Sequence, residues 1–214
     1  GAILMTAGCG GGSAPPPSNN NAGSSSPSSN PGNVSLDKNA YPVFPNADAG
    51  ADPSVPAEQG GKGFKGEEWQ TNTNFDLIGD PRAVKGGTLR QAAMTDFPST
   101  LRYYGPNTHA WTAMLNGMVY ETLLGLHHTS LEYMPALATH WQVSPDKLTF
   151  RFRINPNATF SNGTPVTADD VLASWKLAVD KGLQDPSMNL IFSNFEAPVV
   201  ESRYIVSVKA KTVN

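Results

Sequence analysis

Hydrophobic and polar residues alternate most regularly in the segment TFRFRI, residues 149–154. Phe150, Phe152 and Ile154 are separated by single arginines, and this period of two predicts a strand with one buried face. The segment 155–157, Asn-Pro-Asn, then breaks the pattern. We therefore expect the strand to end at Ile154.

A turn and an amphipathic helix are predicted directly after this strand. Residues 161–163 read Ser-Asn-Gly, and Asn and Gly tolerate the positive φ that tight turns require. Thr167 is suited to cap a helix, with Asp170 three residues later in a shorter version of the capping box. The helix itself is predicted from four apolar residues at helical spacing, Val171, Leu172, Trp175 and Val179.

Weaker patterns predict further elements on both sides of this segment. Strands are expected at Thr88–Met94, Leu124–Leu126, Leu131–Tyr133, Val199–Glu201 and Tyr204–Ala210. Helical structure is expected at Trp111–Leu123, Ala136–His140 and Leu183–Phe192. Because strands and helices interleave along the chain, the predicted fold class is α/β, in a folded region spanning 85–214.

The residues before this region have a different composition. Residues 9–80 are rich in Gly, Ser, Pro and Asn, which predicts a flexible tether followed by a loosely ordered arm with scattered aromatic residues. Residues 1–8 resemble the end of a signal peptide running into a bacterial lipobox, with Ala7 and Gly8 small enough for a peptidase site. Cys9 would then carry lipid, which also accounts for a lone cysteine in an exported chain.

Charge and hydropathy exclude two classes of function. The net charge is −3, and basic residues do not form a patch interleaved with aromatic residues, so we expect no nucleic-acid partner. No apolar run reaches the length of a membrane span, so the expected membrane contact is through the lipid anchor alone.

Four segments in order carry a resemblance to a known family. They are Lys85–Arg90 (KGGTLR), Val119–Leu124 (VYETLL), Pro135–Trp141 (PALATHW) and the strand, turn and helix of 149–175. Together they resemble the family 5 extracellular solute-binding proteins, which bind peptides, nickel or opines for ABC importers. The resemblance implies one partial lobe of a two-lobed periplasmic-binding-protein-like fold, in a chain truncated at both ends.

The same resemblance suggests where a solute would bind. The segment between the first expected strand and the first expected helix lines the cleft in that family, and open α/β sheets place ligands beyond the carboxyl ends of their strands. The candidate ligand-binding residues are therefore Tyr104, Asn107, His109 and Trp111. A second candidate is the segment Asp185–Asn189. This sequence departs from the family pattern before the loop, where Ser99–Arg102 replaces an S-L-D-P-like run.

Other motifs are better explained by ordinary structure. Residues 61–66 fit GxGxxG by letters, but a glycine-rich linker precedes them and two glutamates follow, so we interpret them as linker. Asp48 and Asp52 lack the donor spacing of a calcium loop. The adjacent His127 and His128 point opposite ways on an extended segment, which favours a polar turn over a metal site. We expect no metal, cofactor or catalytic residues.

The function expected from the resemblance is capture of oligopeptides or related solutes for an ABC permease. The protein would be a lipid-anchored monomer in the bacterial periplasm or at the cell surface, and not an enzyme. Two alternatives stay open: a secreted lipoprotein hydrolase with its catalytic residues outside this chain, and a structural envelope lipoprotein. The identity of the solute does not follow from these residues, because binders of different solutes share the four segments.

Overall fold

A computed structural model describes residues 6–8, 48–72, 87–88, 90 and 110–212 of the chain. The helices are α1 (Ala110–Val119), α2 (Ala168–Val179) and α3 (Pro186–Phe192), with short 3-10 turns η2 (Ala57–Gln59) and η3 (Lys181–Leu183). The strands are β1 (Thr6–Gly8), β2 (Tyr120–Thr122), β3 (Leu124–Leu126), β4 (Tyr133–Pro135), β5 (Ala138–Val143), β6 (Thr149–Ile154), β7 (Val199–Val200) and β8 (Ile205–Lys209).

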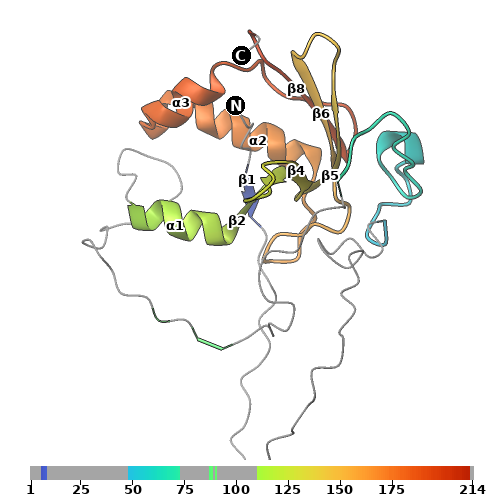
Figure 1. The fold of residues 1–214 in the computed structure, drawn as a ribbon, viewed down its shortest axis with the longest axis horizontal. Coiled ribbons are helices and arrows are strands. Elements are labelled where there is room, and N and C mark those ends of the chain that lie inside the picture. The colour runs from blue at the N-terminus through green and yellow to red at the C-terminus, as the bar shows by residue number, and fades with distance from the viewer. Residues whose placement is uncertain (1–5, 9–47, 73–86, 89, 91–109, 213–214) are drawn as a thin grey trace, which may run out of the picture.

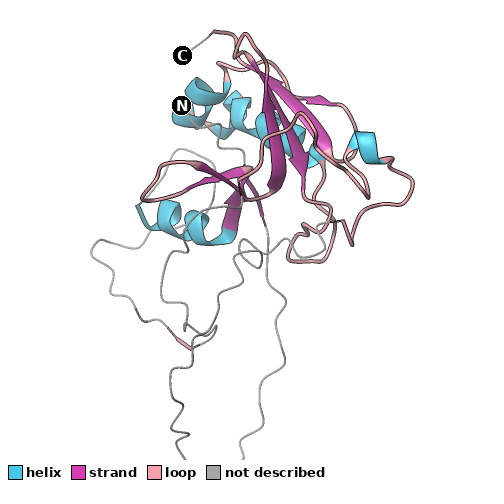
Figure 2. Ribbon diagram, turned by 45° about the vertical axis from the view of Figure 1, so that its right-hand side comes forward, coloured by secondary structure: helices cyan, strands magenta, loops and turns pink. Residues whose placement is uncertain are grey.

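The centre of the described fold is an antiparallel sheet in the order β5-β6-β8-β7. Figure 1 shows α2 and α3 on one side of this sheet and residues 48–72, in cyan to green, on the other. Two smaller antiparallel pairs, β1 with β2 and β3 with β4, lie beside α1 (Figure 2). The mixed helix and strand content confirms the predicted class, and the strand pairs of the described residues are antiparallel.

The predicted alternation of β6 sets the two faces of the sheet. Phe152 lies opposite Trp141 on β5 and Val206 on β8, and these three buried side chains belong to the hydrophobic core beneath the helices. Arg153 lies opposite His140 and Ile205 on the other face. Because side chains alternate along a strand, one face of the sheet is apolar and the other presents polar groups to residues 48–72.

The turn and helix after β6 follow the sequence prediction closely. Gly163 has a φ of 84°, and its N–H donates to the carbonyl of Phe160 at 2.8 Å. At the start of α2, the Asp170 carboxylate accepts a hydrogen bond from the backbone N–H of Thr167 at 2.7 Å, which is one half of the predicted capping box. This confirms the interpretation of Asp170 as a capping residue.

Two sequence predictions near β5 and α1 are wrong. The segment 136–140 was expected to be a helical turn, but β5 begins at Ala138, because pairing with β6 outweighs the local preference of a short segment. The helix expected to reach Leu123 ends at Val119, and Tyr120–Thr122 form β2 paired with β1. The strand expected at Thr88–Met94 falls almost entirely outside the described residues.

Residues 48–72, which we call the strap, pack against the polar face of the sheet. Gly60 shows why glycines are needed there: its φ is 86°, and a Cβ would come within 3.1 Å of Ile205 at the start of β8 and of Tyr204 just before it. Only glycine combines a positive φ with so close an approach. The boundaries assigned to the tether and arm stay predictions, and within them the strap makes specific contacts.

Candidate functional site

The predicted solute-binding loop lies mostly outside the described residues. Tyr104, Asn107 and His109 are among the undescribed positions, and Cys9 is as well, so their assignments stay predictions. Trp111 is described and lies half-buried in the first turn of α1. The structure thus places one of the four candidate residues on a helix beside the two small strand pairs.

Thr112, next to Trp111, is a candidate that the sequence did not reveal. Its side chain is 2% exposed, and its hydroxyl is the buried side-chain atom of the described residues that lacks a hydrogen-bond partner. A buried hydroxyl without a partner costs about 1–3 kcal/mol, so such a group suggests an additional partner. No motif marks this threonine, because its burial depends on tertiary packing.

The second candidate segment, 185–189, has a structural role. Asp185 caps α3 by accepting a hydrogen bond from the N–H of Met188 at 3.0 Å. The side-chain amide of Asn189 donates to the carbonyl of Val179, the last residue of α2, at 2.8 Å. These bonds fix the corner between the two helices, and they account for the polar residues without a solute.

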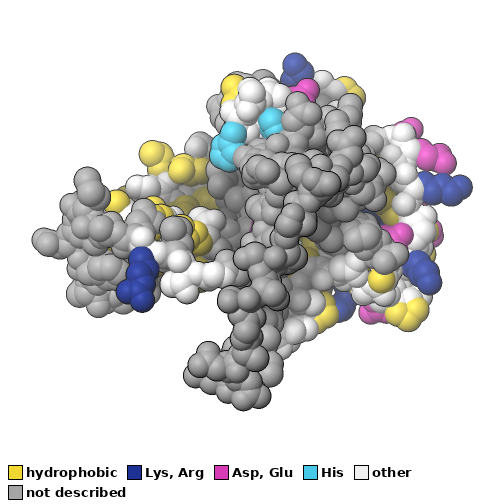
Figure 3. Space-filling view, turned by 60° about the horizontal axis from the view of Figure 1, so that its bottom comes forward, with side chains coloured by type: hydrophobic (Ala, Val, Ile, Leu, Met, Phe, Trp, Pro, Cys, Tyr) yellow, Lys and Arg dark blue, Asp and Glu magenta, His cyan; other side chains and the backbone are white. Residues whose placement is uncertain are grey.

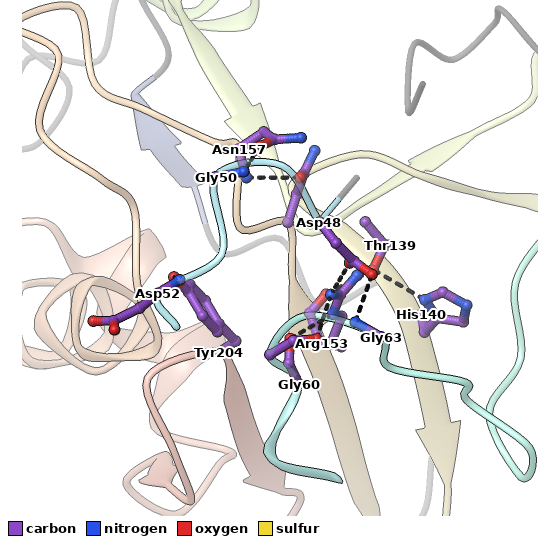
Figure 4. Close-up of polar contacts among 12 residues, drawn as sticks. Asp48, Gly50, Asp52, Gly60, Gly63, Thr139, His140, Arg153, Asn157 and Tyr204 are labelled. Carbon is purple, nitrogen blue, oxygen red and sulfur yellow. Dashed lines mark hydrogen bonds and ion pairs between the residues drawn. The ribbon is translucent and has the colours of Figure 1, made fainter. Parts of the chain in front are cut away.

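Arg153 forms the most buried polar cluster that the structure describes (Figure 4). Its side chain is 2% exposed, and its guanidinium contacts the Asp48 carboxylate at 2.6 Å. It also donates to the carbonyl of Gly60 at 3.0 Å and to the hydroxyl of Thr139 at 3.1 Å. The other carboxylate oxygen of Asp48 accepts from the N–H of Gly63 at 2.9 Å.

This arrangement is a carboxylate-binding site that the chain fills with its own aspartate. A buried guanidinium is tolerated when several acceptors satisfy its donors, and that condition is met here. The ring of Phe64 also lies 5.0 Å from the guanidinium carbon of Arg153. Asp48 and the glycine-rich segment 61–66 therefore have a structural role, because they attach the strap to β6.

His140 lies beside this cluster and is affected by it. Its Nδ1 is 3.0 Å from the hydroxyl of Thr139, and its ring makes an edge contact with Phe64. Burial lowers the pKa of His140 below its ordinary value of 6.5, and the positive charge of Arg153 lowers it further, while Asp48 acts in the opposite direction. The imidazole is consequently held in its neutral form.

The remaining histidines of the described region form a turn. The Nδ1 of His127 accepts hydrogen bonds from the N–H of Ser130 at 3.0 Å and of Thr129 at 3.3 Å, in the hairpin between β3 and β4. Among the described residues, three or more His, Cys, Asp or Glu side chains never gather closely enough to hold a metal ion. Nor does any helix among those residues have the length and apolar character of a membrane span.

Comparison with known proteins relates part of the chain to a family of binding proteins. Residues 132–214 match the model of the bacterial extracellular solute-binding proteins, family 5 middle region. The chain is 38% identical over 95 residues to the dipeptide-binding protein DppE of Bacillus subtilis, covering 44% of this chain and 17% of DppE. It is 34% identical over 73 residues to the periplasmic oligopeptide-binding protein OppA of Haemophilus influenzae, covering 33% and 14%.

A solved oligopeptide-binding protein of Borrelia burgdorferi aligns with 55% of this chain and 26% of its own length, with a TM-score of 0.46 and 19% identity. The chain thus spans less than a fifth of DppE and of OppA.

Proposed function

We propose that the intact protein is a family 5 extracellular solute-binding protein that captures oligopeptides for an ABC importer, because residues 132–214 match the model of that family's middle region. The observation that carries the proposal is the family match together with the names of the relatives, since DppE is named for dipeptides and OppA for oligopeptides. We further propose that the protein is a monomer, anchored in the periplasm or at the cell surface through lipid on Cys9.

The proposed mechanism is binding without covalent chemistry. An extended peptide offers its main-chain N–H and C=O groups to the protein, as in the addition of a strand to a sheet. Its side chains would enter wide pockets in which bridging waters replace fixed partners, so that many sequences are accepted. A hinge between two lobes would close on the peptide, and the closed form would deliver it to the permease.

The first turn of α1 is the proposed contact region within this chain. Tyr104, Asn107 and His109 precede the helix, and Trp111 lies in its first turn. The unpartnered hydroxyl of Thr112 supports this location, because a peptide carbonyl would supply the acceptor that it lacks. Trp111 would add apolar contact area.

The proposal is tested by identifying what the protein retains. The intact protein should be purified from its own host without denaturation, and the released small molecules should be analysed by mass spectrometry. We expect a mixture of short peptides bound at one molecule per protein. Recovery of a single sugar, opine or metal chelate would overturn the assignment of oligopeptides as the solute. Cleavage of the captured peptide by the protein would overturn the proposal that it binds without covalent chemistry.

The location of the site is tested by replacing both Trp111 and Asn107 with alanine. Loss of a buried aromatic contact typically weakens binding by about 1–2 kcal/mol or more, so we expect peptide affinity to fall at least roughly tenfold by calorimetry. Met118→Ala is a matched control, since Met118 lies on the same helix and is 65% exposed. Unchanged affinity in the double variant would move the site elsewhere.

The lipid anchor makes an independent prediction. Cys9 is the single cysteine of the chain, so Cys9→Ala should abolish incorporation of labelled fatty acid and release the protein from the membrane fraction. Thr6→Leu, which brings the segment closer to the usual lipobox, should leave labelling intact or increase it. Fatty-acid labelling that persists in Cys9→Ala would contradict the assignment without affecting the solute proposal.

A further inference from the structure

The strap covers the free edge of β5 as well as the polar face of the sheet. Gln70 and Trp141 exchange two backbone hydrogen bonds, of 2.7 and 2.9 Å, and the Gln70 side chain accepts from the indole N–H of Trp141 at 2.8 Å. The hydroxyl of Thr71 donates to the carbonyl of Thr139 at 2.9 Å. The strap therefore supplies partners to a strand edge that would otherwise be open to other chains.

Other strap contacts reach β8 and the segment before it. The N–H of Asp52 donates to the hydroxyl of Tyr204 at 2.8 Å, and the hydroxyl of Ser202 donates to the carbonyl of Gln59 at 2.6 Å. Trp69 lies under the guanidinium of Arg151, 4.9 Å from its carbon. Most of these bonds join polar groups near the surface, where water competes as a partner.

The strap contributes little to the hydrophobic core. The buried core cluster of the described residues runs from Leu123 to Val208 and lies between the sheet and its helices. Within the strap, the buried residues are Gly60 and Gly61, which have no side chains to bury. Regions with few buried apolar contacts open at a lower free energy than the whole domain, so the strap is able to detach while the core stays packed.

Two titratable groups lie at the centre of the strap contact. The charged groups that face the imidazole of His140 are Arg153 from β6 and Asp48 from the strap. The ring of Phe64 makes an edge contact with the imidazole, and a Cβ added at Gly66 would come within 3.0 Å of it. Partial burial of Asp48 raises its pKa, but the hydrogen bonds from Arg153 and Gly63 outweigh this and hold the pKa below its ordinary 3.8.

We propose that the strap is a latch, closed on the sheet at neutral pH, that opens on acidification while the sheet and its helices remain folded, and so uncovers the edge of β5. Closing it places His140 and Asp48 where protonation is disfavoured, so the closed latch binds fewer protons than the open one. Its stability is therefore complete at neutral pH, declines as the pH falls through the range in which His140 takes up a proton in the open latch, and declines again below the ordinary pKa of 3.8 of the Asp48 carboxyl.

The latch does not depend on solute binding. Its use would come from the proposed anchor, because the strap lies between Cys9 and the sheet along the chain. A closed latch holds residues 48–72 on the sheet face opposite α2 and α3 (Figure 1), whereas an open one adds this segment to the length of chain between the anchor and the sheet.

The test is amide hydrogen exchange of the intact protein, measured by mass spectrometry at about pH 7.5 and about pH 5 and corrected for intrinsic exchange. We expect the protection of strap peptides to fall severalfold at the lower pH, while β6 and β8 keep theirs. His140→Gln should remove this pH dependence, because glutamine does not titrate. Asp48→Asn should lower strap protection at both pH values by roughly ten- to a hundredfold, as expected for loss of a charge-assisted hydrogen bond.

Asp52→Asn is the matched control, because the Asp52 carboxylate accepts its hydrogen bonds from Ser54 within the strap and reaches the sheet side only through Arg203, at 3.9 Å on the surface. Its strap protection should equal that of the original protein. The proposal is overturned when strap and sheet lose protection together in the original protein, when strap protection is independent of pH there, or when its pH dependence survives in His140→Gln. Peptide binding, measured on the same samples, reports on the solute proposal separately.

Discussion

Replacing Phe152 with alanine is expected to lower the free energy of unfolding of this region by about 3–5 kcal/mol, the usual cost of removing a buried aromatic ring. Phe152 is 3% exposed and lies at the middle of β6, between Trp141 on β5 and Val206 on β8. The side chain faces the α2 and α3 side, and the cavity left behind is bordered by three strands that cannot collapse independently. Denaturant unfolding followed by circular dichroism measures the loss.

The neighbouring position provides the control for this prediction. Arg151 lies one residue earlier on the same strand, but it points to the opposite face and pairs with Glu201 at the surface. Exposed ion pairs contribute about 0–1 kcal/mol, so Arg151→Ala should change the unfolding free energy little. Equal losses in the two variants would contradict the assignment of one apolar and one polar face to this sheet.

Local sequence pattern predicted correctly those elements whose buried residues follow a regular helix or strand period. The alternation of TFRFRI predicted both the strand and the face that it buries, and the turn and cap chemistry predicted where α2 begins. The hairpin strands at Leu124–Leu126 and Tyr133–Pro135 and the helix α3 were also close to their predicted positions. In these cases propensity, pattern and tertiary contacts agree.

Predictions from local pattern fail where a contact joins distant segments. Asp48 and Arg153 are 105 residues apart, and the strap between 48 and 72 has the glycine content of a linker. The arginine at 153 reads as a solvent-facing residue of an alternating strand, yet its side chain is almost fully buried. Its burial depends on a segment whose own sequence shows no periodic pattern, so neither part predicts the contact alone.

The exposure of several apolar side chains is a second feature that local sequence pattern does not predict. Figure 3 shows exposed hydrophobic groups at several places on this face of the molecule, including a group at its left. Several large ones around α1 and the β3–β4 hairpin are exposed, namely Met118, Val119, Tyr120, Leu126, Leu131 and Tyr133. Leu131 also has a φ of 59°, which is unusual for a bulky residue. The candidate solute site adjoins this region, and its residues were suggested by family resemblance; local physics did not single them out.

Arg153→Met is expected to release the strap even at neutral pH. The replacement keeps much of the volume of the side chain but removes the donors that bond Asp48, Gly60 and Thr139. Breaking a buried ion pair by removing one partner typically costs about 3–5 kcal/mol. We expect this cost to exceed the free energy with which the other, mostly polar surface contacts keep the strap closed. Trypsin should then cleave after the exposed Lys62 and Lys65 much faster than in the original protein.

Arg203→Met separates this effect from a general loss of charge. Arg203 also pairs with a strap aspartate, but its side chain is 40% exposed and the distance to Asp52 is 3.9 Å. Cleavage of that variant should proceed at the original rate, because a distant surface pair contributes little. Combining Arg153→Met with Asp48→Asn should reduce the stability of the closed strap by clearly less than the sum of the two single losses, because each change removes the same contact. Additive losses would mean that Arg153 holds the strap through packing, and that the ion pair with Asp48 contributes nothing to its closure.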